Sequence, residues 1–427
     1  MEQKKTIAFQ TFGCRLNFAE TSSISMSFQK KGYTQVGFKD KADIYVINSC
    51  TVTNNAEKRC KEAIRRAKKI NPEAKIALVG CYAQLRPDEL ESLNNVDYIL
   101  GNKEKFHLLD YIEKPDSNCF TSHEDILKVS EFSPAYSIEG RTRSFLKIQD
   151  GCDYFCTFCA IPFARGTSRS DTIANTVKQA EEIAAAGQKE IALTGVNIGT
   201  FGKNHKESFY ELLCALENVN GIERIRTGSI EPNLLTDEII EHISKSKKIL
   251  PHFHIPLQSG SDTMLKMMKR KYTREVFASR VIKIKEKMPL ACVAADVIIG
   301  FPGESEEHFL ETYHFLNDLP VSYLHVFSYS DRPEAKASKM DHKVNGKDKK
   351  NRSERLHQLG DKKARDFYKL NTNTEHTVLW EASNKKGMMS GLTENYIQVY
   401  TTYQAKKVNS QEIVLLKKLN EQGKWII

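Results

Sequence analysis

The segment Phe145-Leu-Lys-Ile-Gln-Asp-Gly-Cys-Asp-Tyr-Phe-Cys-Thr-Phe-Cys-Ala160 begins with a short apolar run and ends with three closely spaced cysteines. The apolar run, from Phe145 to Gln149, predicts a buried strand. Cys152, Cys156 and Cys159 follow with C-x3-C-x2-C spacing, on a loop where three thiolates can converge. The segment therefore predicts a strand that delivers three metal ligands to one edge of a sheet.

Three cysteines at this spacing favour an iron–sulfur cluster over a zinc site. Tetrahedral zinc needs a fourth ligand, and no neighbouring residue supplies one. A [4Fe-4S] cluster held by three cysteines leaves one iron open, which the amino and carboxylate groups of S-adenosylmethionine can chelate. Electron transfer into the sulfonium then gives a 5′-deoxyadenosyl radical, which abstracts hydrogen from unreactive C–H bonds.

The same strand is the first of several strand-and-helix repeats. One intervening helix is marked by Ser170 and Asp171 as caps and by Gly187 as the stop. The repeats predict a partial (β/α) barrel over residues 138–368. The predicted strands are Phe145–Gln149, Glu190–Thr194, Ile225–Ser229, Phe253–Leu257, Val293–Ile299 and Tyr323–Tyr329.

The first part of the chain predicts a doubly wound parallel sheet over residues 1–125. Apolar runs at Thr6–Gln10, Ile44–Asn48 and Ile76–Gly80 predict buried strands, and Asn54–Ile70 has helical spacing. The pattern loosens between Glu104 and Arg143, which suits a linker.

Cys14, Cys50 and Cys81 each lie just past one of these predicted strands. Because the carboxyl ends of parallel strands share one edge, we expect the three cysteines to meet there. A second three-cysteine cluster is the preferred interpretation, with buried packing cysteines as the alternative. Packing is the interpretation preferred for the remaining cysteines, Cys60, Cys119, Cys214 and Cys292.

Residues 371–427 change character to short β-rich runs separated by glycines. They predict a small antiparallel β-barrel of a kind that often presents a face to nucleic acid. The predicted strands are Thr377–Trp380, Tyr396–Thr402, Lys407–Val408 and Ile413–Leu416.

Composition narrows the class of protein. The 427 residues suit two or three domains, and ten cysteines without an apolar leader favour a reducing compartment. No apolar run is long enough to span a membrane, so a cytoplasmic location is expected. The net charge of +9, from 63 basic and 54 acidic residues, mildly favours a polyanionic partner.

The chain resembles the radical-SAM methylthiotransferase family over nearly its whole length. Thr11-Phe-Gly-Cys-Arg-Leu-Asn17, Ile47-Asn-Ser-Cys-Thr-Val-Thr53 and Val79-Gly-Cys-Tyr-Ala83 are similar to the three cluster motifs of that family. The region Ile148–Gly166 and the motifs His254-Ile-Pro-Leu-Gln-Ser-Gly-Ser261 and Val297-Ile-Ile-Gly-Phe-Pro-Gly-Glu304 most resemble the branch acting on N6-threonylcarbamoyladenosine in tRNA.

This resemblance implies that a methylthio group is placed on C2 of that base, beside the anticodon. It implies two [4Fe-4S] clusters: one on Cys152, Cys156 and Cys159 generates the radical, and the other carries or donates the sulfur. A second S-adenosylmethionine, a low-potential electron donor and a sulfur source would also be needed.

The resemblance also implies other site residues. Gln258, at a strand end, could bond the substrate base or the sulfur, although a buried structural amide is the alternative. His252 and His254 lack identifiable partners in the sequence and are not assigned as ligands. Seven residues are expected at S-adenosylmethionine: Thr194, Gly195, Asn197, Ser229, Glu231, Val297 and Gly300.

The RNA is expected to contact basic and aromatic residues, because cations neutralise phosphates and aromatic rings stack on bases. The C-terminal segment resembles the TRAM-like RNA-binding barrel of the family, but its basic excess is slight, so binding is expected to span domains. The candidates are Arg165, Arg169, the runs Lys269–Arg274 and Lys347–Arg355, Trp380, Tyr396, Tyr400 and Tyr403.

Three alternatives stay open on the sequence. A methylthiotransferase acting on a ribosomal-protein aspartate shares the fold and clusters, and so does the isopentenyladenosine branch of the tRNA enzymes. A non-catalytic iron–sulfur or zinc RNA-binding protein would use the cysteines structurally.

Overall fold

The computed structural model describes the chain except residues 1–4, 52–53, 94, 115–119, 139–141 and 421–422. The amino-terminal lobe contains the strands β1 (Thr6–Thr11), β2 (Thr34–Val36), β3 (Ile44–Ser49), β4 (Lys75–Gly80), β5 (Tyr98–Leu100) and β6 (Phe120–Ser122). They form one sheet in the order β2-β1-β3-β4-β5-β6, and all neighbours run parallel. The predicted doubly wound parallel sheet is confirmed.

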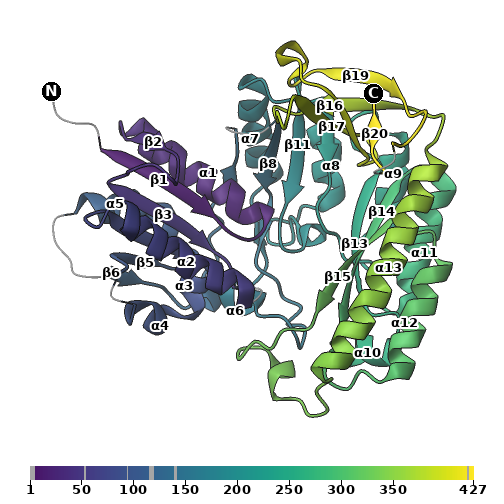
Figure 1. The fold of residues 1–427 in the computed structure, drawn as a ribbon, viewed down its shortest axis with the longest axis horizontal. Helices are drawn as coiled ribbons and strands as arrows, with labels where there is room; N and C mark the ends of the chain where they lie inside the picture. The colour runs from purple at the N-terminus through teal and green to yellow at the C-terminus, as the bar shows by residue number, and fades with distance from the viewer. Residues whose placement is uncertain (1–4, 52–53, 94, 115–119, 139–141, 421–422) are drawn as a thin grey trace.

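Helices cover both faces of this sheet (Figure 1). Ile24 of α1 and Leu108 of α5 belong to the apolar core on one face, and Ile64 of α2 belongs to the core on the other. Strand β3 is buried along its whole length, as expected for a parallel strand between two helical layers. The helices are α1 (Arg15–Lys30), α2 (Asn54–Ile70), α3 (Cys81–Leu85), α4 (Pro87–Glu91) and α5 (Leu108–Glu113).

In its described residues, the predicted linker between Glu104 and Arg143 contains several short elements. It contributes α5, the edge strand β6 and β7 (Ala135–Tyr136), which pairs with the central lobe. These pieces are too short for a periodic signal, and they form by pairing with strands already in place.

The central lobe is an open barrel of parallel strands. It contains β8 (Arg143–Lys147), β11 (Glu190–Thr194), β12 (Arg224–Arg226), β13 (His252–Gln258), β14 (Cys292–Ile299) and β15 (Tyr323–Ser328). Parallel bridges from Ile225 to Ile249 and from Ser229 to His254 join its two sheets. One large apolar core runs through the lobe. The predicted partial barrel is confirmed.

Helices on the outside of the barrel follow most strands. They are α6 (Ile161–Arg165), α7 (Ile173–Ala185), α8 (Phe209–Glu217), α9 (Asp237–Lys245), α10 (Asp262–Met267), α11 (Arg274–Lys287) and α12 (Glu306–Asp318). Helix α7 is capped by Thr172, whose side chain accepts a hydrogen bond from the Asn175 N–H, rather than by Ser170 or Asp171. A short ribbon of β9 (Gln149–Asp150) and β10 (Arg169–Ser170) flanks the cysteine loop.

A long helix, α13 (Gly346–Leu370), runs along β15 and leads into the C-terminal sheet (Figure 1). This curled, open sheet contains β16 (Glu375–Trp380), β17 (Met388–Thr393), β18 (Gln398–Thr402), β19 (Gln411–Leu415) and β20 (Trp425–Ile426). It is antiparallel except where β18 meets β20. The predicted strand Lys407–Val408 is instead a short 3-10 turn, Ala405–Lys407. Among the helices of the described residues, none has both the length and the apolar character needed to cross a membrane.

Candidate functional site

The cysteine loop follows β9 and folds back on itself. Gly151 has φ +69°, and a Cβ there would lie 1.9 Å from the backbone oxygen of Thr167, so only glycine fits this turn. The Cys159 N–H donates to the Cys156 carbonyl at 3.0 Å. Burial raises the pKa of Cys152 and of Cys159 to about 12, and the nearby Cys156 adds to both effects. The three cysteines therefore share one loop in desolvated surroundings that disfavour free thiolates.

Arg270 reaches into this loop from the barrel. Its Nη1 donates to the Cys156 Sγ at 3.1 Å, and its Nη2 pairs with Glu231. Burial raises the pKa of Glu231, although Arg270 opposes that effect. The guanidinium thus links the cysteine loop to the strand end that carries Glu231.

Cys14, Cys50 and Cys81 follow the carboxyl ends of β1, β3 and β4, which are neighbours in the amino-terminal sheet. A Cβ on Gly13 would lie 3.0 Å from the Cys50 Sγ, so Cys50 packs against the turn that carries Cys14. Cys14 and Cys81 are close enough to interact electrostatically. Cys14 is exposed, whereas the other two are buried.

A buried network of charges lies between the two cysteine trios. Glu20 accepts from Lys105 at 2.6 Å, from Lys147 at 2.9 Å and from Arg165 at 3.0 Å. Asp150 accepts from Lys147 at 2.8 Å, from Arg165 at 2.9 Å and from Arg169 at 3.2 Å. Four buried cations thus share two carboxylates.

Two asparagines connect this network to the amino-terminal cysteines. Asn17 accepts from Arg165 at 2.6 Å and lies 3.9 Å from the Cys14 Sγ. Asn102 accepts from Lys105 at 2.7 Å and directs its Nδ2 to the Cys81 Sγ at 3.5 Å. The excess positive charge therefore borders the sulfur atoms.

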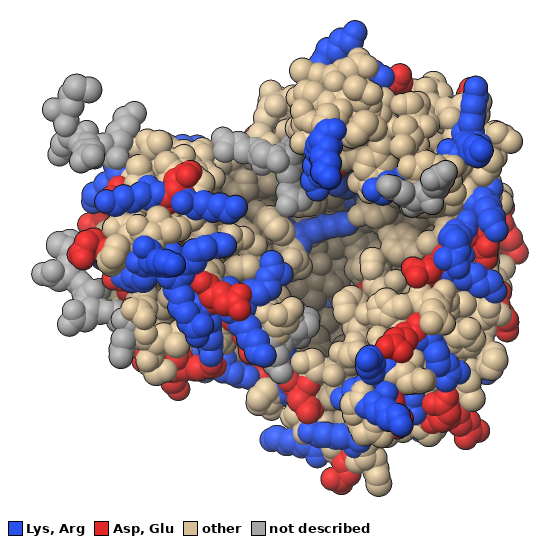
Figure 2. Space-filling model, viewed as in Figure 1, with Lys and Arg blue, Asp and Glu red and all other residues tan. Residues whose placement is uncertain are grey.

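An interlobe cavity of about 640 Å³ opens between the three lobes, where Figure 2 shows the surface hollowed. The amino-terminal lobe contributes Cys14 and Arg15, and the C-terminal sheet contributes Tyr396. The barrel strands and their ends contribute further lining residues, among them Thr194, Gly195, Ser229, His254 and His325.

A second cavity, the loop cavity, has a volume of about 370 Å³ and adjoins the cysteine loop. Gln258 lines it from a β-bulge at the end of β13, with the strained φ of +67°. Its other lining residues include Thr51, Phe158, Cys159, Asp296, Ile298 and Tyr329.

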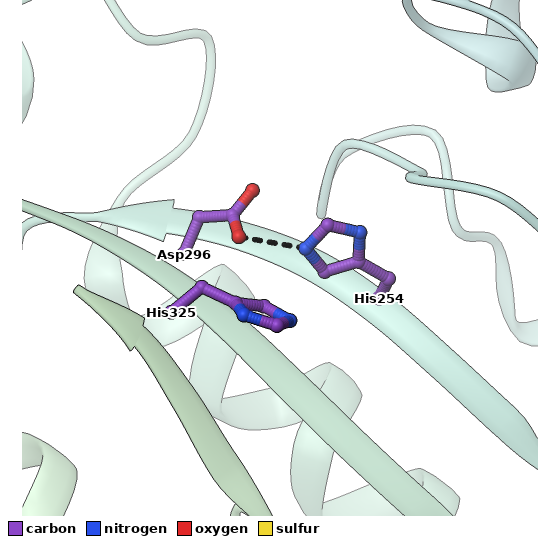
Figure 3. Close-up of side chains that lie close together, drawn as sticks. All are labelled: His254, Asp296 and His325. Atoms are coloured by element: carbon purple, nitrogen blue, oxygen red, sulfur yellow. Dashed lines mark hydrogen bonds and ion pairs between the residues drawn. The ribbon is translucent and has the colours of Figure 1, made fainter. Parts of the chain in front are cut away.

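His254, Asp296 and His325 stand side by side on the neighbouring strands β13, β14 and β15 (Figure 3). The His254 Nε2 lies 2.7 Å from the Asp296 Oδ1, and the His254 and His325 rings meet edge to face at 5.2 Å. The two histidines line the interlobe cavity and Asp296 lines the loop cavity, so this cluster connects the two. Asp296 was not recognisable as the partner of His254 in the sequence, because the two residues are distant along the chain.

Residues 6–101 match the model of a family described as Uncharacterized protein family UPF0004, and residues 146–316 match the Radical SAM superfamily. The chain is 42% identical to "Threonylcarbamoyladenosine tRNA methylthiotransferase MtaB" of Bacillus subtilis, over 92% of this chain and 90% of that protein. The chain belongs to the radical SAM methylthiotransferase family.

Other proteins of the family are similar over most of the chain, and a solved structure shares its fold. The MtaB protein of Aquifex aeolicus is also 42% identical, over 92% of this chain and 96% of its own. A "tRNA-2-methylthio-N(6)-dimethylallyladenosine synthase" of Staphylococcus haemolyticus is 34% identical, over 92% of this chain and 79% of its own. A solved structure shows the radical S-adenosylmethionine methyltransferase TsrM of Kitasatospora setae with cobalamin and a [4Fe-4S] cluster bound. It shares the fold of this chain with a TM-score of 0.59 at 12% identity, and the match covers 91% of this chain and 81% of TsrM.

Radical SAM methylthiotransferases use S-adenosylmethionine, and several residues expected at that cofactor line the interlobe cavity. Thr194, Gly195 and Ser229 do so. Asn197 is buried nearby; both of its amide atoms lack a hydrogen bond of normal geometry, although the Tyr154 hydroxyl is close. Glu231 is instead held by Arg270.

Two residues expected at the cofactor are placed differently. Val297 points into the barrel core, because side chains alternate along β14 and its neighbours Asp296 and Ile298 take the cavity side. Gly300 has φ +71°, and a Cβ there would lie 2.4 Å from the Lys349 side chain of α13. The Cβ position of Gly300 therefore faces α13.

Several RNA candidates are buried, which excludes them from direct contact with RNA. Arg165 and Arg169 belong to the buried charge network. Arg270, in the run Lys269–Arg274, points its side chain to Cys156 of the cysteine loop. Arg352 of the run Lys347–Arg355 pairs with Glu304 in a buried site. Trp380 is fully buried in the C-terminal core.

The sequence missed Arg270, Asp296 and His325 as parts of the site. Strand alternation from the predicted β14 could have identified Asp296, but no local signal separates Arg270 from a solvated basic run. Two of the cysteines assigned to packing, Cys60 and Cys292, do lie in apolar cores, while Cys119 lies outside the described residues.

Proposed function

We propose that this enzyme adds a methylthio group to C2 of N6-threonylcarbamoyladenosine next to the anticodon of tRNA, with two [4Fe-4S] clusters. The observation that carries the proposal is the interlobe cavity, which brings Cys14 and the expected cofactor residues Thr194 and Ser229 onto one surface. A base in that cavity would have a sulfur site on one side and the radical source on the other.

The radical site is assigned to Cys152, Cys156 and Cys159 with S-adenosylmethionine. When bound, the cluster and cofactor supply reductive cleavage of the sulfonium to a 5′-deoxyadenosyl radical. The unpaired amide of Asn197 suits a polar ligand group. The rings of Phe158 and Tyr329, with Ile298, give the loop cavity a flat apolar lining suited to an adenine base, and Gln258 can bond at its rim.

The second cluster is assigned to Cys14, Cys50 and Cys81. Four buried cations sharing two carboxylates leave an excess of positive charge, which is costly unless an anion lies nearby. Three thiolates on an iron–sulfur core would supply that negative charge through Asn17 and Asn102, so the residues fit the group. The exposure of Cys14 would allow a substrate to reach a cluster that donates sulfur.

The choice of substrate follows the relatives. Proteins named for threonylcarbamoyladenosine are 36–42% identical to the chain, and those named for dimethylallyladenosine are 32–36% identical. A low-potential electron donor and a sulfur source complete the proposed partners. The dimethylallyl base and the ribosomal-protein aspartate are the alternatives that the same clusters could serve.

We also propose three units, at about residues 1–125, 138–368 and 371–427. The separate sheets support this division, although the pairing of β7 with β8 moves the start of the barrel unit to residue 135 or earlier.

The test is anaerobic reconstitution with iron and sulfide, followed by iron counting, S-adenosylmethionine cleavage and mass spectrometry of tRNA nucleosides. Wild type should hold about eight irons, two cubanes of four, and form the methylthio base. Cys156→Ala should lose cleavage and product, whereas Cys50→Ala should keep cleavage and lose product. Cys214→Ala, outside both trios, is the control and should behave as wild type. Four irons in wild type, or product from Cys50→Ala, would contradict the proposal.

A further inference from the structure

Arg15 is a cation that lines the interlobe cavity. It begins α1, directly after Cys14, and is half-buried. Its Nη2 donates to the Tyr396 hydroxyl at 3.3 Å, and its guanidinium lies 5.9 Å from the centre of the Phe145 ring. In the part of the chain that the structure describes, no carboxylate lies within 4.0 Å of it.

The other described arginines beside the cavity each contact a carboxylate, although Arg226 shares Glu190 with Arg224. Arg143 pairs with Glu381 at 2.9 Å, and both line the cavity. Arg226, which lies over the Tyr396 ring, pairs with Glu190 at 3.0 Å. Among the described arginines of the lining, Arg15 therefore differs from Arg143 in having no carboxylate within 4.0 Å.

The charge of Arg15 also acts on the histidines of the cavity. Burial is the main cause that lowers the pKa of His252 and of His325, and the positive charge of Arg15 adds to it in both cases. The same charge repels a divalent cation from His254, Asp296 and His325. The cavity therefore favours an anionic ligand over a metal ion.

We propose that Arg15 recognises the carboxylate of the threonylcarbamoyl group. The inference rests on the proposed function and adds the residue that selects this base over one with a hydrocarbon substituent. N6 and C2 lie on the same edge of adenine, so an N6 substituent can reach Arg15 while C2 faces the neighbouring Cys14. A guanidinium and a carboxylate form two parallel charge-assisted hydrogen bonds, and Tyr396 and Phe145 hold the guanidinium in place.

The test compares two anticodon stem-loops, one with N6-threonylcarbamoyladenosine and one with its neutral carboxyl methyl ester. Dissociation constants and product formation are measured for wild type, Arg15→Gln and Arg15→Lys. Wild type should prefer the acid by about 100-fold, because the ester leaves a buried cation unpaired. Arg15→Gln should lose this preference, mainly by weaker binding of the acid, and Arg15→Lys should keep part of it.

Two control variants separate recognition of the carboxylate from a general loss of charge or of folding. Arg280→Gln, which removes an ion pair with Asp237 and lines neither cavity, should keep the full preference. Tyr396→Phe removes the hydroxyl that accepts a hydrogen bond from Arg15, so it should reduce the preference for the acid without altering iron content. This variant replaces Arg15→Gln in the test if Arg15→Gln fails to hold iron.

If Arg15→Gln weakens the binding of both stem-loops equally, Arg15 contacts an RNA phosphate and the inference is overturned. An unchanged preference for the acid in Arg15→Gln would also overturn it. A wild type that binds the acid selectively but forms no methylthio base would refute the proposed function alone.

Discussion

Arg270 donates a hydrogen bond from its Nη1 to the sulfur of Cys156, 3.1 Å away. The pairing of Arg270 with the buried Glu231 fixes this contact. A cation bonded to a ligating sulfur stabilises the reduced, more negative state of an iron–sulfur cluster. Arg270 is therefore a positioning and tuning residue for the radical site.

Replacing Arg270 with Gln should make the cluster harder to reduce. We expect its midpoint potential to fall by roughly 60 mV, a tenfold change for a one-electron couple, with slower S-adenosylmethionine cleavage at fixed reductant. Arg270→Lys should shift the midpoint potential much less than Arg270→Gln does. The control Arg365→Gln, at an exposed position, should leave the midpoint potential unchanged. Redox titration followed by electron paramagnetic resonance measures the shift, and an unaltered midpoint in Arg270→Gln would contradict the tuning role.

The metal-free protein should lose stability at alkaline pH. Burial raises the pKa of Cys152 and Cys159 to about 12 from an ordinary 9.0, so the folded state holds these protons more tightly than the unfolded state. Stability is therefore complete below pH 9 and falls as pH rises toward 12, by about 1.4 kcal/mol per pH unit for each thiol. Urea titrations at pH 8, 9 and 10 should show this slope.

The slope should flatten in the double variant Cys152→Ala and Cys159→Ala but persist in Cys214→Ala. An equal slope in all three proteins would assign the effect to other groups.

Glu20→Gln should destabilise the fold strongly. Burial opposes ionisation of Glu20, but Arg165, Lys105 and Lys147 together hold its pKa well below the usual range. Removing the carboxylate leaves buried cations without a partner, at a cost of about 3–5 kcal/mol in the free energy of unfolding. Urea unfolding of the metal-free protein measures this cost. The exposed Glu62→Gln is the control and should change it by less than about 0.5 kcal/mol.

Glu190 should control the attachment of the C-terminal sheet. It orients Arg224 and Arg226 at 2.7 and 3.0 Å, and these donate to the carbonyls of Thr377 and Thr393. Burial opposes its ionisation, yet the arginines lower its pKa to about 2. The stabilisation is present above about pH 4.5 and is lost as pH falls toward 2.

Limited proteolysis should therefore release the C-terminal sheet faster from Glu190→Gln than from wild type at pH 7, and faster from wild type at pH 3 than at pH 7. Glu181→Gln, at an exposed position on α7, should match wild type. Equal cleavage rates in all variants would show that other contacts hold the sheet.

Replacing Gln258 with Gly should stabilise the fold and reduce activity. Its φ of +67° is unfavourable for a residue with a side chain, so Gln258→Gly should raise the free energy of unfolding by about 1 kcal/mol. Because Gln258 lines the loop cavity, product formation should fall while iron content is kept. Lys206→Gly, at an exposed position with φ +57°, should gain stability without losing activity. Full activity in Gln258→Gly would remove Gln258 from the site.

Local pattern predicted the elements whose signal lies within one segment. The helix Asn54–Ile70 and the strand Glu190–Thr194 have the predicted bounds, because each repeats its apolar residues at one period. The edge strand β6 and the short strand β7 escaped prediction, because a segment of two or three residues is too short for a periodic signal and forms a strand only beside an existing one.

The sequence by itself determined the two cysteine trios and the parallel sheets that carry them. Spacing placed Cys152, Cys156 and Cys159 on one loop, and strand order brought Cys14, Cys50 and Cys81 to one edge. Only the tertiary structure decided which arginine side chains have a carboxylate or sulfur partner. The side chains of Arg165, Arg169 and Arg270 are buried with acidic or sulfur partners, whereas Arg15 lines the cavity and no carboxylate of the described residues lies within 4.0 Å of it. The sequence cannot separate these arginines, because the partner that neutralises a side chain is set by the packing of distant segments.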